Sequence, residues 1–493
     1  MLTELTIVSS VSISYSSRLP FLKNRGSLFV AILMERMEVG HPFYLHEVIY
    51  LFLWYDLKML HVSSFTFGAY KIDTARSIIT FTYHVEFRYG ITKTFTDRLF
   101  FKNVAPELWD KIPKAVLEPT LQALLLMIGI NYWSVFPTKN IRIEGFILTR
   151  AQAHFWDSIY LNGLGEFFYL MKIDFRNLIS FPYDESLATP TPARFERPKR
   201  ALLLNGAGKD SILSAEMLKA SGTPFDFFTF SPTSSHKNIA NLVGVKTINV
   251  GRRRDPWINL MTSCGAYPSV STFTFVAVLL AELLGYDSIF FSNERSADFG
   301  NLNYLGLSVN HQWCKSSEAE KMINNYIQSF ITPDIRTLSL LRTYSELEIV
   351  RRFVCYPQYF HDVTSCNVYF QIDPIERFLW RTKWCNRCAK CVFLFACFSA
   401  FLPKKEVINI FGANLYAKKS LLPLFKRILG IEGFKPLDCV GEPEEMILAM
   451  HYAALSNEYS DEPAMQLFEE YFPPNYDFEK LTQGVLTDEY NNL

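Results

Sequence analysis

A short apolar run that leads into a glycine-containing turn and then a helix places the strongest constraint on this chain. Residues 201–204 are Ala-Leu-Leu-Leu, residues 205–208 are Asn-Gly-Ala-Gly, and residues 212–218 have helical apolar spacing. The two glycines allow backbone angles that other residues resist, and they let the backbone approach a ligand closely. Such a turn at a helix N-terminus presents free N–H groups and the positive end of the helix dipole, so it suits an anion such as pyrophosphate. The alternative is an ordinary turn capped by Asp210 or Ser211, and the turn alone leaves both interpretations open.

Two common nucleotide-binding motifs do not fit this turn. A P-loop would require glycine in place of Leu203 and serine or threonine in place of Asp210. The dinucleotide-binding motif would require a third glycine in place of Ser211. The turn instead resembles the Ser-Gly-Gly-x-Asp-Ser loop of the ATP pyrophosphatase (PP-loop) superfamily, whose members release AMP and pyrophosphate from ATP. The matching residues are Gly206, Ala207, Gly208, Lys209, Asp210 and Ser211.

Ala207 stands where that loop has a glycine. An alanine disfavours positive φ, because its Cβ crowds the backbone there. The alanine is therefore tolerable in this loop only if residue 207 does not need a positive φ.

Beyond residue 200 the chain alternates between strand-like and helix-like segments. Short apolar runs indicate buried strands, and longer stretches with apolar spacing near 3.6 residues indicate helices. This alternation predicts an α/β fold with a doubly wound parallel sheet, in which ligands bind beyond the carboxyl ends of the strands. The predicted strands are 202–204, 225–230, 245–250 and 288–291, and the predicted helices begin at Ile212 and Thr272.

Composition divides the chain into six segments, with the proline-rich stretch 182–199 as the clearest linker. The acidic C-terminal segment is expected to be solvated and partly disordered. The segments are an uncertain N-terminal extension (1–60), a β-rich and then helical N-terminal domain (61–181), the linker (182–199), a PP-loop ATP-binding domain (200–350), a cysteine-rich and helical C-terminal subdomain (351–456) and the acidic tail (457–493).

Charge and hydropathy argue against several classes of partner. The formal net charge is zero, so no electrostatic surplus favours nucleic acid. The apolar stretches 27–34 and 121–130 are too short to span a membrane, which predicts a soluble protein. All nine cysteines lie between residues 264 and 439, and this odd, uneven distribution favours a reducing, cytoplasmic compartment over a disulfide framework. The oligomeric state cannot be predicted from these features.

Three cysteines at three-residue steps, Cys385, Cys388 and Cys391, predict a metal site. On a regular helix they would spread over about a third of the circumference, so we expect a turn that directs the thiolates at one ion. Cys366 is the preferred fourth ligand. Four sulfur ligands indicate a closed, structural zinc site, and an iron–sulfur cluster is the alternative. The reserve ligands are Cys355, His361 and Cys397.

Two polar segments follow the last predicted strand. Residues 292–301 contain seven polar residues in ten, and His311 lies between two amide side chains, Asn310 and Gln312. Polar groups concentrated at the carboxyl end of a strand favour a ligand site, with a polar loop and an ion pair as the alternative. By contrast, we expect at least two of the three arginines at 252–254 to form a solvated face, as charge runs usually do.

Six separate pieces of residues 150–445 resemble one branch of this superfamily, the UDP-N-acetylmuramoyl-L-alanyl-L-glutamate epimerase family. The order and spacing of the pieces are more specific than any one of them. The β-rich stretch 64–102 also resembles the N-terminal part of that family. The six pieces are 160–167, 206–211, 292–301, 310–312, 365–366 with 384–391, and 438–441.

The resemblance implies an ATP-consuming isomerase of peptidoglycan precursor synthesis with an adenine nucleotide alpha-hydrolase-like fold. The terminal L-glutamate of a UDP-linked muramoyl dipeptide would be activated as an acyl-adenylate and inverted at its α-carbon, with AMP and diphosphate as by-products. The resemblance also implies ATP and Mg²⁺ at residues 206–211 and structural Zn²⁺ at the cysteines. The implied catalytic residues are His311 as acid or base, Arg295 as the partner of a substrate carboxylate, and Glu294 and Glu166 as further acid/base candidates.

Two alternative functions remain open. Another carboxylate-adenylating enzyme, such as a 7-cyano-7-deazaguanine synthase-like ligase, would also combine this loop with cysteine-bound zinc. The second alternative is a catalytically inactive nucleotide-binding homologue. Ala207 and Ala266 point to it, because Ala266 stands where the epimerase family is expected to have a histidine.

Overall fold

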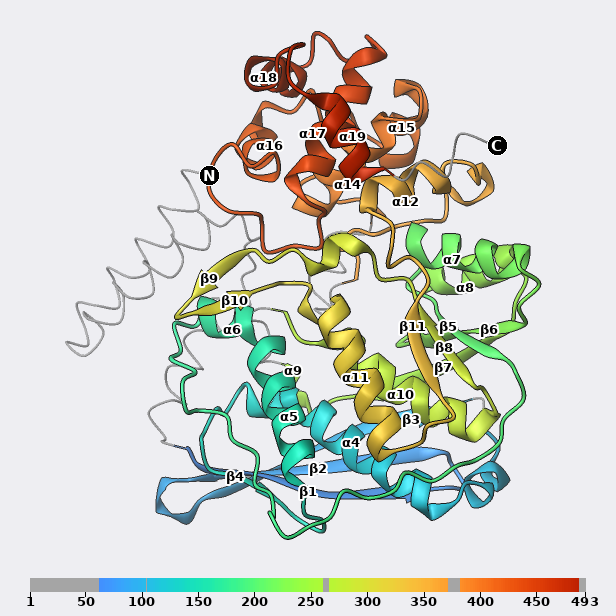
Figure 1. The fold of residues 1–493 in the computed structure, drawn as a ribbon, viewed down its shortest axis with the longest axis vertical. Coiled ribbons are helices and arrows are strands. Elements are labelled where there is room, and N and C mark those ends of the chain that lie inside the picture. The colour runs from blue at the N-terminus through green and yellow to red at the C-terminus, as the bar shows by residue number, and fades with distance from the viewer. Residues whose placement is uncertain (1–61, 103, 260–265, 371–381, 487–493) are drawn as a thin grey trace, which may run out of the picture.

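A nine-stranded sheet runs through the protein (Figure 1). The computed structural model describes residues 62–102, 104–259, 266–370 and 382–486, so the predicted N-terminal extension lies outside the described residues. From one edge of the sheet to the other, the strands are β11 (Arg336–Ser339), β8 (Ser288–Phe291), β5 (Ala201–Leu204), β6 (Phe225–Phe230), β7 (Thr247–Arg253), β3 (Thr92–Phe101), β2 (Ile78–Phe87), β1 (Val62–Asp73) and β4 (Ile141–Ile143).

Five neighbouring strands, from β11 to β7, run parallel to one another. The first of these strands in the chain, β5, lies in the middle, with β6 and β7 on one side and β8 and β11 on the other. The predicted parallel α/β sheet is therefore confirmed for this part of the chain. β7 extends beyond its predicted end at Val250, because residues 250–253 pair with β3.

The β-rich N-terminal segment continues the same sheet through antiparallel strands β3, β2 and β1. At the junction of β3 with β7, Arg252 Nη2 lies 2.7 Å from Oδ2 of the fully buried Asp97. The prediction of a solvated arginine face is therefore wrong. Of the three arginines at 252–254 only Arg253 is exposed, since the strand junction buries Arg252 against Asp97.

The sheet separates two hydrophobic cores. Along β5, Leu202 faces one core, whereas Ala201 and Leu203 face the other, as the two-residue period of a strand requires. Burial on both faces explains why β5 is an uninterrupted apolar run. The first core is covered by α4 (Lys114–Trp133), α5 (Arg150–Gly163), α6 (Gly165–Leu170), α10 (Ser269–Leu284) and α11 (Ser317–Phe330), and the second by α7 (Lys209–Ala220), α8 (Ser234–Val243) and the C-terminal helices.

Short elements connect these layers. A short helix, α9 (Pro256–Asn259), follows β7, and a 3₁₀ turn at Arg295–Asp298 follows β8. Next in the chain, β9 (Leu302–Tyr304) and β10 (Leu307–Val309) form a separate antiparallel hairpin. These connections place the polar segment after β8 close to the C-terminal helices.

Helix α4 is, among the described residues, the one helix that is long and apolar enough to cross a membrane by length and composition. However, 72% of its most apolar 18-residue window is buried inside the protein, and the helix packs against α10 and β1. Its position in the core accounts for its apolar sequence. The helix begins at Lys114, after residues 106–111 form a 3₁₀ turn that ends before Pro113.

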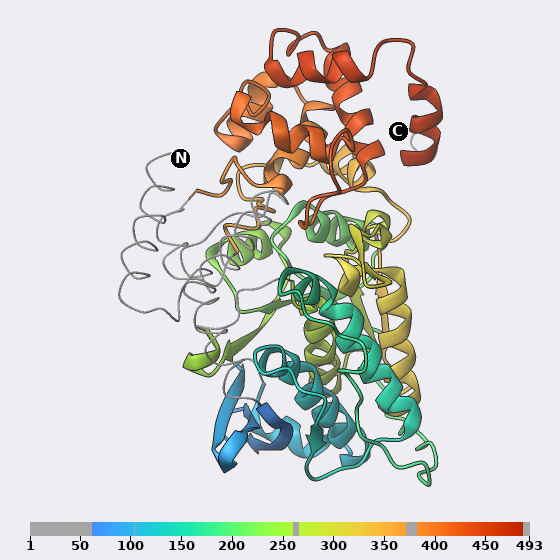
Figure 2. The ribbon, with the colours of Figure 1, turned by 90° about the vertical axis from the view of Figure 1, so that its left-hand side faces the viewer.

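The C-terminal helices form a cap at one end of the molecule, opposite the N-terminal strands (Figures 1 and 2). The predicted disorder of the acidic tail is wrong for its described part, since α18 and α19 pack on the cap and bury Phe468, Phe478 and Val485. The charged residues lie on the outer faces of these helices. The cap consists of α12 (Glu346–Phe353), α14 (Ala389–Ser399), α15 (Lys404–Phe411), α16 (Leu422–Ile428), α17 (Pro443–Leu455), α18 (Pro463–Tyr471) and α19 (Phe478–Val485).

Candidate functional site

Two segments singled out in the sequence meet at the carboxyl end of the parallel strands. The loop after β5 and the segment after β8 lie where the strand order reverses, since β6 is on one side of β5 and β8 on the other. The hydroxyl oxygens of Ser214, in α7, and Ser292, after β8, are 2.8 Å apart and join the two segments. Open α/β sheets bind ligands in the crevice at such a point.

The loop after β5 is a tight turn with an accessible backbone. Asn205 Oδ1 accepts a hydrogen bond from the N–H of Ala207 (2.9 Å), which closes the turn. Gly206 is exposed, and a Cβ at this residue would meet no atom within 4 Å, so a ligand has room to approach the backbone. Gly208 is buried, and a Cβ there would lie 2.9 Å from Ser365 Oγ. The close approach of residue 365 therefore requires glycine at position 208.

Ala207 has a φ of 54°, so this residue does adopt the positive φ that an alanine disfavours. A left-handed backbone costs about 1–2 kcal/mol for a residue that has a Cβ. The hydrogen bond from Ala207 to Asn205 and a bond from the N–H of Thr364 to the carbonyl of Ala207 (3.3 Å) hold this conformation. The surrounding structure thus gives an alanine the backbone shape that a glycine would adopt freely.

Behind the loop lies a buried cluster of Lys209, Glu346 and Lys390, whose side chains are each at most 5% exposed. Lys209 forms an ion pair with Glu346, and its Nζ also lies 2.5 Å from Asp210 Oδ1. On the other side, Lys390 Nζ lies 2.5 Å from Glu346 Oε1. Glu346 and Lys390 were not among the residues predicted from the sequence, and they lie in the first turns of α12 and α14.

All three groups of this cluster are charged at neutral pH. Burial by itself would lower the pKa of Lys209, but the carboxylates of Asp210 and Glu346 outweigh it and hold that pKa above its ordinary value. Burial would likewise lower the pKa of Lys390, which Glu346 raises. Burial would raise the pKa of Glu346, but the two ammonium groups hold it well below its usual range. Charges fixed in this way need no reorganisation when phosphate charge develops beside them.

Four cysteine sulfurs converge beside the N-terminus of α14. The Sγ atoms of Cys366, Cys385, Cys388 and Cys391 all lie within 4.8 Å of one another, and those of Cys385 and Cys391 are 3.7 Å apart. Tetrahedral zinc with Zn–S bonds of about 2.3 Å would have S···S edges of about 3.8 Å, so these sulfurs fit a single ion. The structure thus brings the four preferred ligands together. The reserve ligands lie outside this group of sulfurs: Cys355, His361 and Cys397.

This cysteine cluster is connected to the loop after β5 and to the buried charges. Lys390 directly precedes Cys391 in the first turn of α14. Cys366 directly follows Ser365, which packs on Gly208. An ion held by the four sulfurs would therefore fix both Lys390 and the wall of the loop.

His311 is paired with a buried glutamate. Its Nδ1 lies 2.5 Å from Glu166 Oε2, and its backbone N–H donates to Asn301 Oδ1 (2.8 Å). Glu166 lies in α6, which begins at Gly165 because the chain breaks helix α5 after Gly163. Burial would lower the pKa of His311, but the carboxylate of Glu166 outweighs it and holds that pKa well above its ordinary value. The pairing with Glu166 therefore favours the protonated form of the His311 imidazole.

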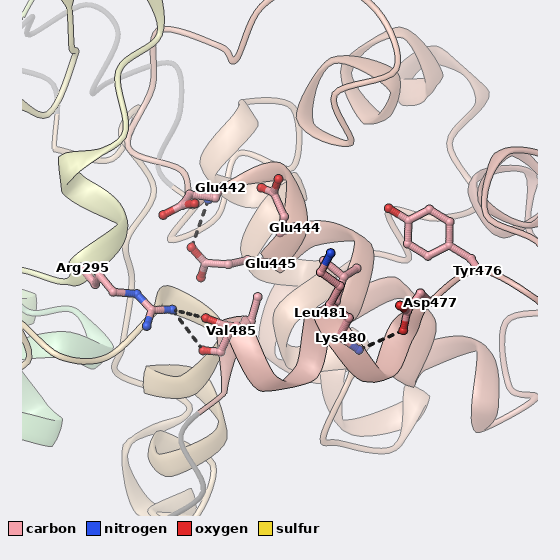
Figure 3. Close-up of a pocket in the computed structure, with 10 residues that line it drawn as sticks. Arg295, Glu442, Glu444, Glu445, Tyr476, Asp477, Lys480, Leu481 and Val485 are labelled. Carbon is pink, nitrogen blue, oxygen red and sulfur yellow. Dashed lines mark hydrogen bonds between the residues drawn. The ribbon is translucent and has the colours of Figure 1, made fainter.

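Glu294 and Arg295 have different surroundings although they are adjacent. Glu294 is 2% exposed, and its Oε1 has no hydrogen-bond partner among the residues that the structure describes. Arg295 Nη2 donates to the carbonyls of Gly484 (2.9 Å) and Val485 (3.4 Å) at the end of α19 (Figure 3). The groove beside this guanidinium has a volume of about 430 Å³ and is lined partly by Glu442, Glu444 and Glu445. Arg295 therefore binds the cap, and no hydrogen bond or ion pair among the described residues joins it to His311 or Lys209.

The chain matches two family descriptions over most of its length. The MurL N-terminal domain matches residues 57–340, and the MurL C-terminal domain matches residues 362–482. The first match covers the sheet, the loop after β5 and His311. The second covers the cysteine cluster and most of the C-terminal cap.

Three curated relatives share the name UDP-N-acetyl-alpha-D-muramoyl-L-alanyl-L-glutamate epimerase. The relative from Xanthomonas oryzae pv. oryzae is 30% identical over 423 residues, which are 84% of this chain and 91% of the relative. The relative from Micromonospora is 30% identical over 87% of this chain and 95% of its own length. The relative from Salinispora tropica is 28% identical over 83% of this chain and 88% of its own length.

Proposed function

Because this chain belongs to the MurL epimerase family, we propose that it inverts the terminal L-glutamate of UDP-MurNAc-L-Ala-L-Glu to D-glutamate in an ATP-dependent reaction. The substrate is the one that the names of the relatives give. The reaction belongs to peptidoglycan precursor synthesis, and we assign it to the cytoplasm, where ATP and UDP-linked precursors are available.

Inversion of this α-carbon requires activation of the neighbouring carboxylate. Removal of the α-proton next to a carboxylate would build charge on a group that is already negative. An acyl-adenylate lacks that charge, so its α-proton is far more acidic. The proposed sequence is therefore adenylation with release of pyrophosphate, exchange of the α-proton from one face to the other, and hydrolysis that releases AMP and the D-glutamyl product.

The loop after β5 and the buried lysines carry this proposal. The accessible backbone of Gly206 and the N-terminus of α7 suit the phosphates of ATP, and Lys209 is fixed beside them to stabilise developing phosphate charge. Asp210 would hold Mg²⁺, because its carboxylate is partly exposed beside the loop and Mg²⁺ prefers oxygen ligands. When bound, the ion would neutralise phosphate charge. At the cysteine cluster we propose Zn²⁺, in a closed structural site.

His311 and Glu294 are the candidates for proton transfer at the α-carbon. Glu166 holds His311 and favours its protonated form, so His311 is suited to donate a proton. In the described part of the chain, a buried carboxylate oxygen of Glu294 has no hydrogen-bond partner, so this residue is available to accept a proton. The two residues would serve opposite faces of the α-carbon. Arg295 would bind a substrate carboxylate once it is released from the end of α19.

Replacement of Asp210 by alanine tests the nucleotide part of the proposal. We expect Asp210→Ala to reduce substrate-dependent AMP formation from ATP by at least about 100-fold, as for loss of one group that stabilises a charged transition state. The measurement is chromatographic separation of AMP from labelled ATP in the presence of Mg²⁺ and the muramoyl dipeptide. Asp461→Ala, at an exposed residue of the cap, is the matched control and should form AMP at the wild-type rate. Wild-type AMP formation by Asp210→Ala would contradict the assignment of this loop.

A further inference from the structure

A cysteine with no role in the proposed reaction lies against His311. The loop that carries Cys439 is fixed on both sides of this residue. The N–H of Cys439 donates to Asp438 Oδ1 (2.8 Å), and Gln312 Nε2 donates to the carbonyl of Val440 (3.1 Å). Since Gln312 follows His311 in the chain, this second bond holds the Cys439 loop beside the histidine.

The side chains of Glu166, His311 and Cys439 form one interacting group. His311 bonds Glu166 through Nδ1 (2.5 Å), and the imidazole interacts electrostatically with the thiol of Cys439. An acid that orients an imidazole, which in turn acts on a thiol, is the arrangement of enzymes with a cysteine nucleophile. The three residues come from α6, the segment after β10 and the loop before α17, so the fold assembles them from distant parts of the chain.

Cations surround this thiol and favour its ionised form. Burial would raise the pKa of Cys439, but Lys315, His311 and Lys390 together hold it below its ordinary value. Lys315 also interacts electrostatically with Glu346 and Asp210. The two lysines that favour the thiolate of Cys439, Lys315 and Lys390, therefore also interact with Glu346 behind the loop after β5.

We propose that Cys439 is a nucleophile that takes over the activated glutamate as a thioester. This inference rests on the proposed function, because it requires the acyl-adenylate. In this version of the reaction AMP leaves before the α-proton is exchanged, rather than at the final hydrolysis. A thioester, like the acyl-adenylate, lacks the carboxylate charge, so the α-proton stays acidic after AMP has left. The covalent bond would hold the acyl group beside His311 while its α-carbon is inverted.

The steps balance without a further reactant. The Cys439 thiolate bonds to the acyl carbon, and the bond from that carbon to the phosphate oxygen of AMP breaks, with AMP leaving as an anion. One group then removes the α-proton, and another returns a proton to the opposite face. Water finally attacks the acyl carbon, the C–S bond breaks, and both protons of the water pass to solvent as the carboxylate and the thiolate form.

Three assays on Cys439→Ala separate this role from others. Exchange of labelled pyrophosphate into ATP reports adenylation, and we expect it to stay within about threefold of wild type. AMP release and incorporation of solvent deuterium at the α-carbon should both fall at least about 100-fold, because each follows the thioester. Cys355→Ala, at an exposed cysteine outside the site, is the matched control and should match wild type in all three assays.

A trapping experiment on the wild-type protein does not depend on how the variant folds. Acid quench during turnover, followed by mass spectrometry, should show Cys439 carrying the substrate minus water, and neutral hydroxylamine should remove the adduct. Absence of this adduct, or wild-type AMP release by Cys439→Ala, would overturn the thioester. Absence of pyrophosphate exchange in the wild type would instead refute adenylation, and with it the proposed function on which the thioester rests.

Discussion

Replacement of Glu346 by glutamine is expected to lower the free energy of unfolding by about 3–5 kcal/mol, the range for removal of one partner from a buried ion pair. Glu346 is the carboxylate between two buried ammonium groups, those of Lys209 and Lys390. A neutral amide would leave Lys390 without its ion-pair partner and Lys209 with Asp210 alone. Because a protein of this kind is stable by only about 5–15 kcal/mol, the loss is a large fraction of the total.

Urea denaturation followed by circular dichroism measures this effect. Glu469→Gln, at an exposed position of α18, makes the same chemical change away from any buried charge. This control is expected to stay within about 0.5 kcal/mol of wild type, as surface substitutions usually do. If Glu346→Gln also stayed within that range, the buried cluster would not have the energetic role that its geometry indicates.

Replacement of Cys388 by alanine is expected to remove one equivalent of bound zinc and to unfold part of the C-terminal cap. Structural zinc sites contribute on the order of 10 kcal/mol of folding free energy in small domains, so the loss is large. Since Lys390 and Ser365 adjoin ligands of the same cluster, AMP formation should be lost together with the metal. Elemental analysis by mass spectrometry and thermal denaturation measure the two effects.

Cys355→Ala is the matched control for the metal site, since Cys355 is exposed and lies outside the four-sulfur group. It should retain a full equivalent of zinc and the wild-type denaturation temperature. Loss of zinc from this control would make Cys355 a ligand and contradict the geometry. Iron in the wild-type protein would overturn the assignment of zinc.

The parallel half of the sheet could be predicted because its central strands are buried on both faces. β5 and β6 are nearly uninterrupted apolar runs, which stand out in the sequence. The edge strand β11 could not be recognised in this way. Its residues, Arg336 to Ser339, alternate between exposed and buried positions and include a single large apolar side chain, Leu338.

The candidate site could be predicted only where its residues are close in the chain. The loop from Gly206 to Ser211 and the three clustered cysteines carry local spacing signals, whereas Lys209 and Glu346 are 137 residues apart. Glu346 follows the N-cap residue Ser345, so in the sequence it resembles an ordinary first-turn acid. One signal was available for Lys390, because it is the only charged residue of the otherwise apolar helix α14.

If adenylation drives inversion of the glutamate α-carbon, a single incubation of the wild-type protein reveals both events. The protein is incubated with ATP, Mg²⁺ and UDP-MurNAc-L-Ala-L-Glu in deuterated water, and the glutamate of the product is analysed for configuration and isotope content. We expect D-glutamate with deuterium at the α-carbon, together with AMP and pyrophosphate. Recovery of undeuterated L-glutamate without AMP would contradict this expectation.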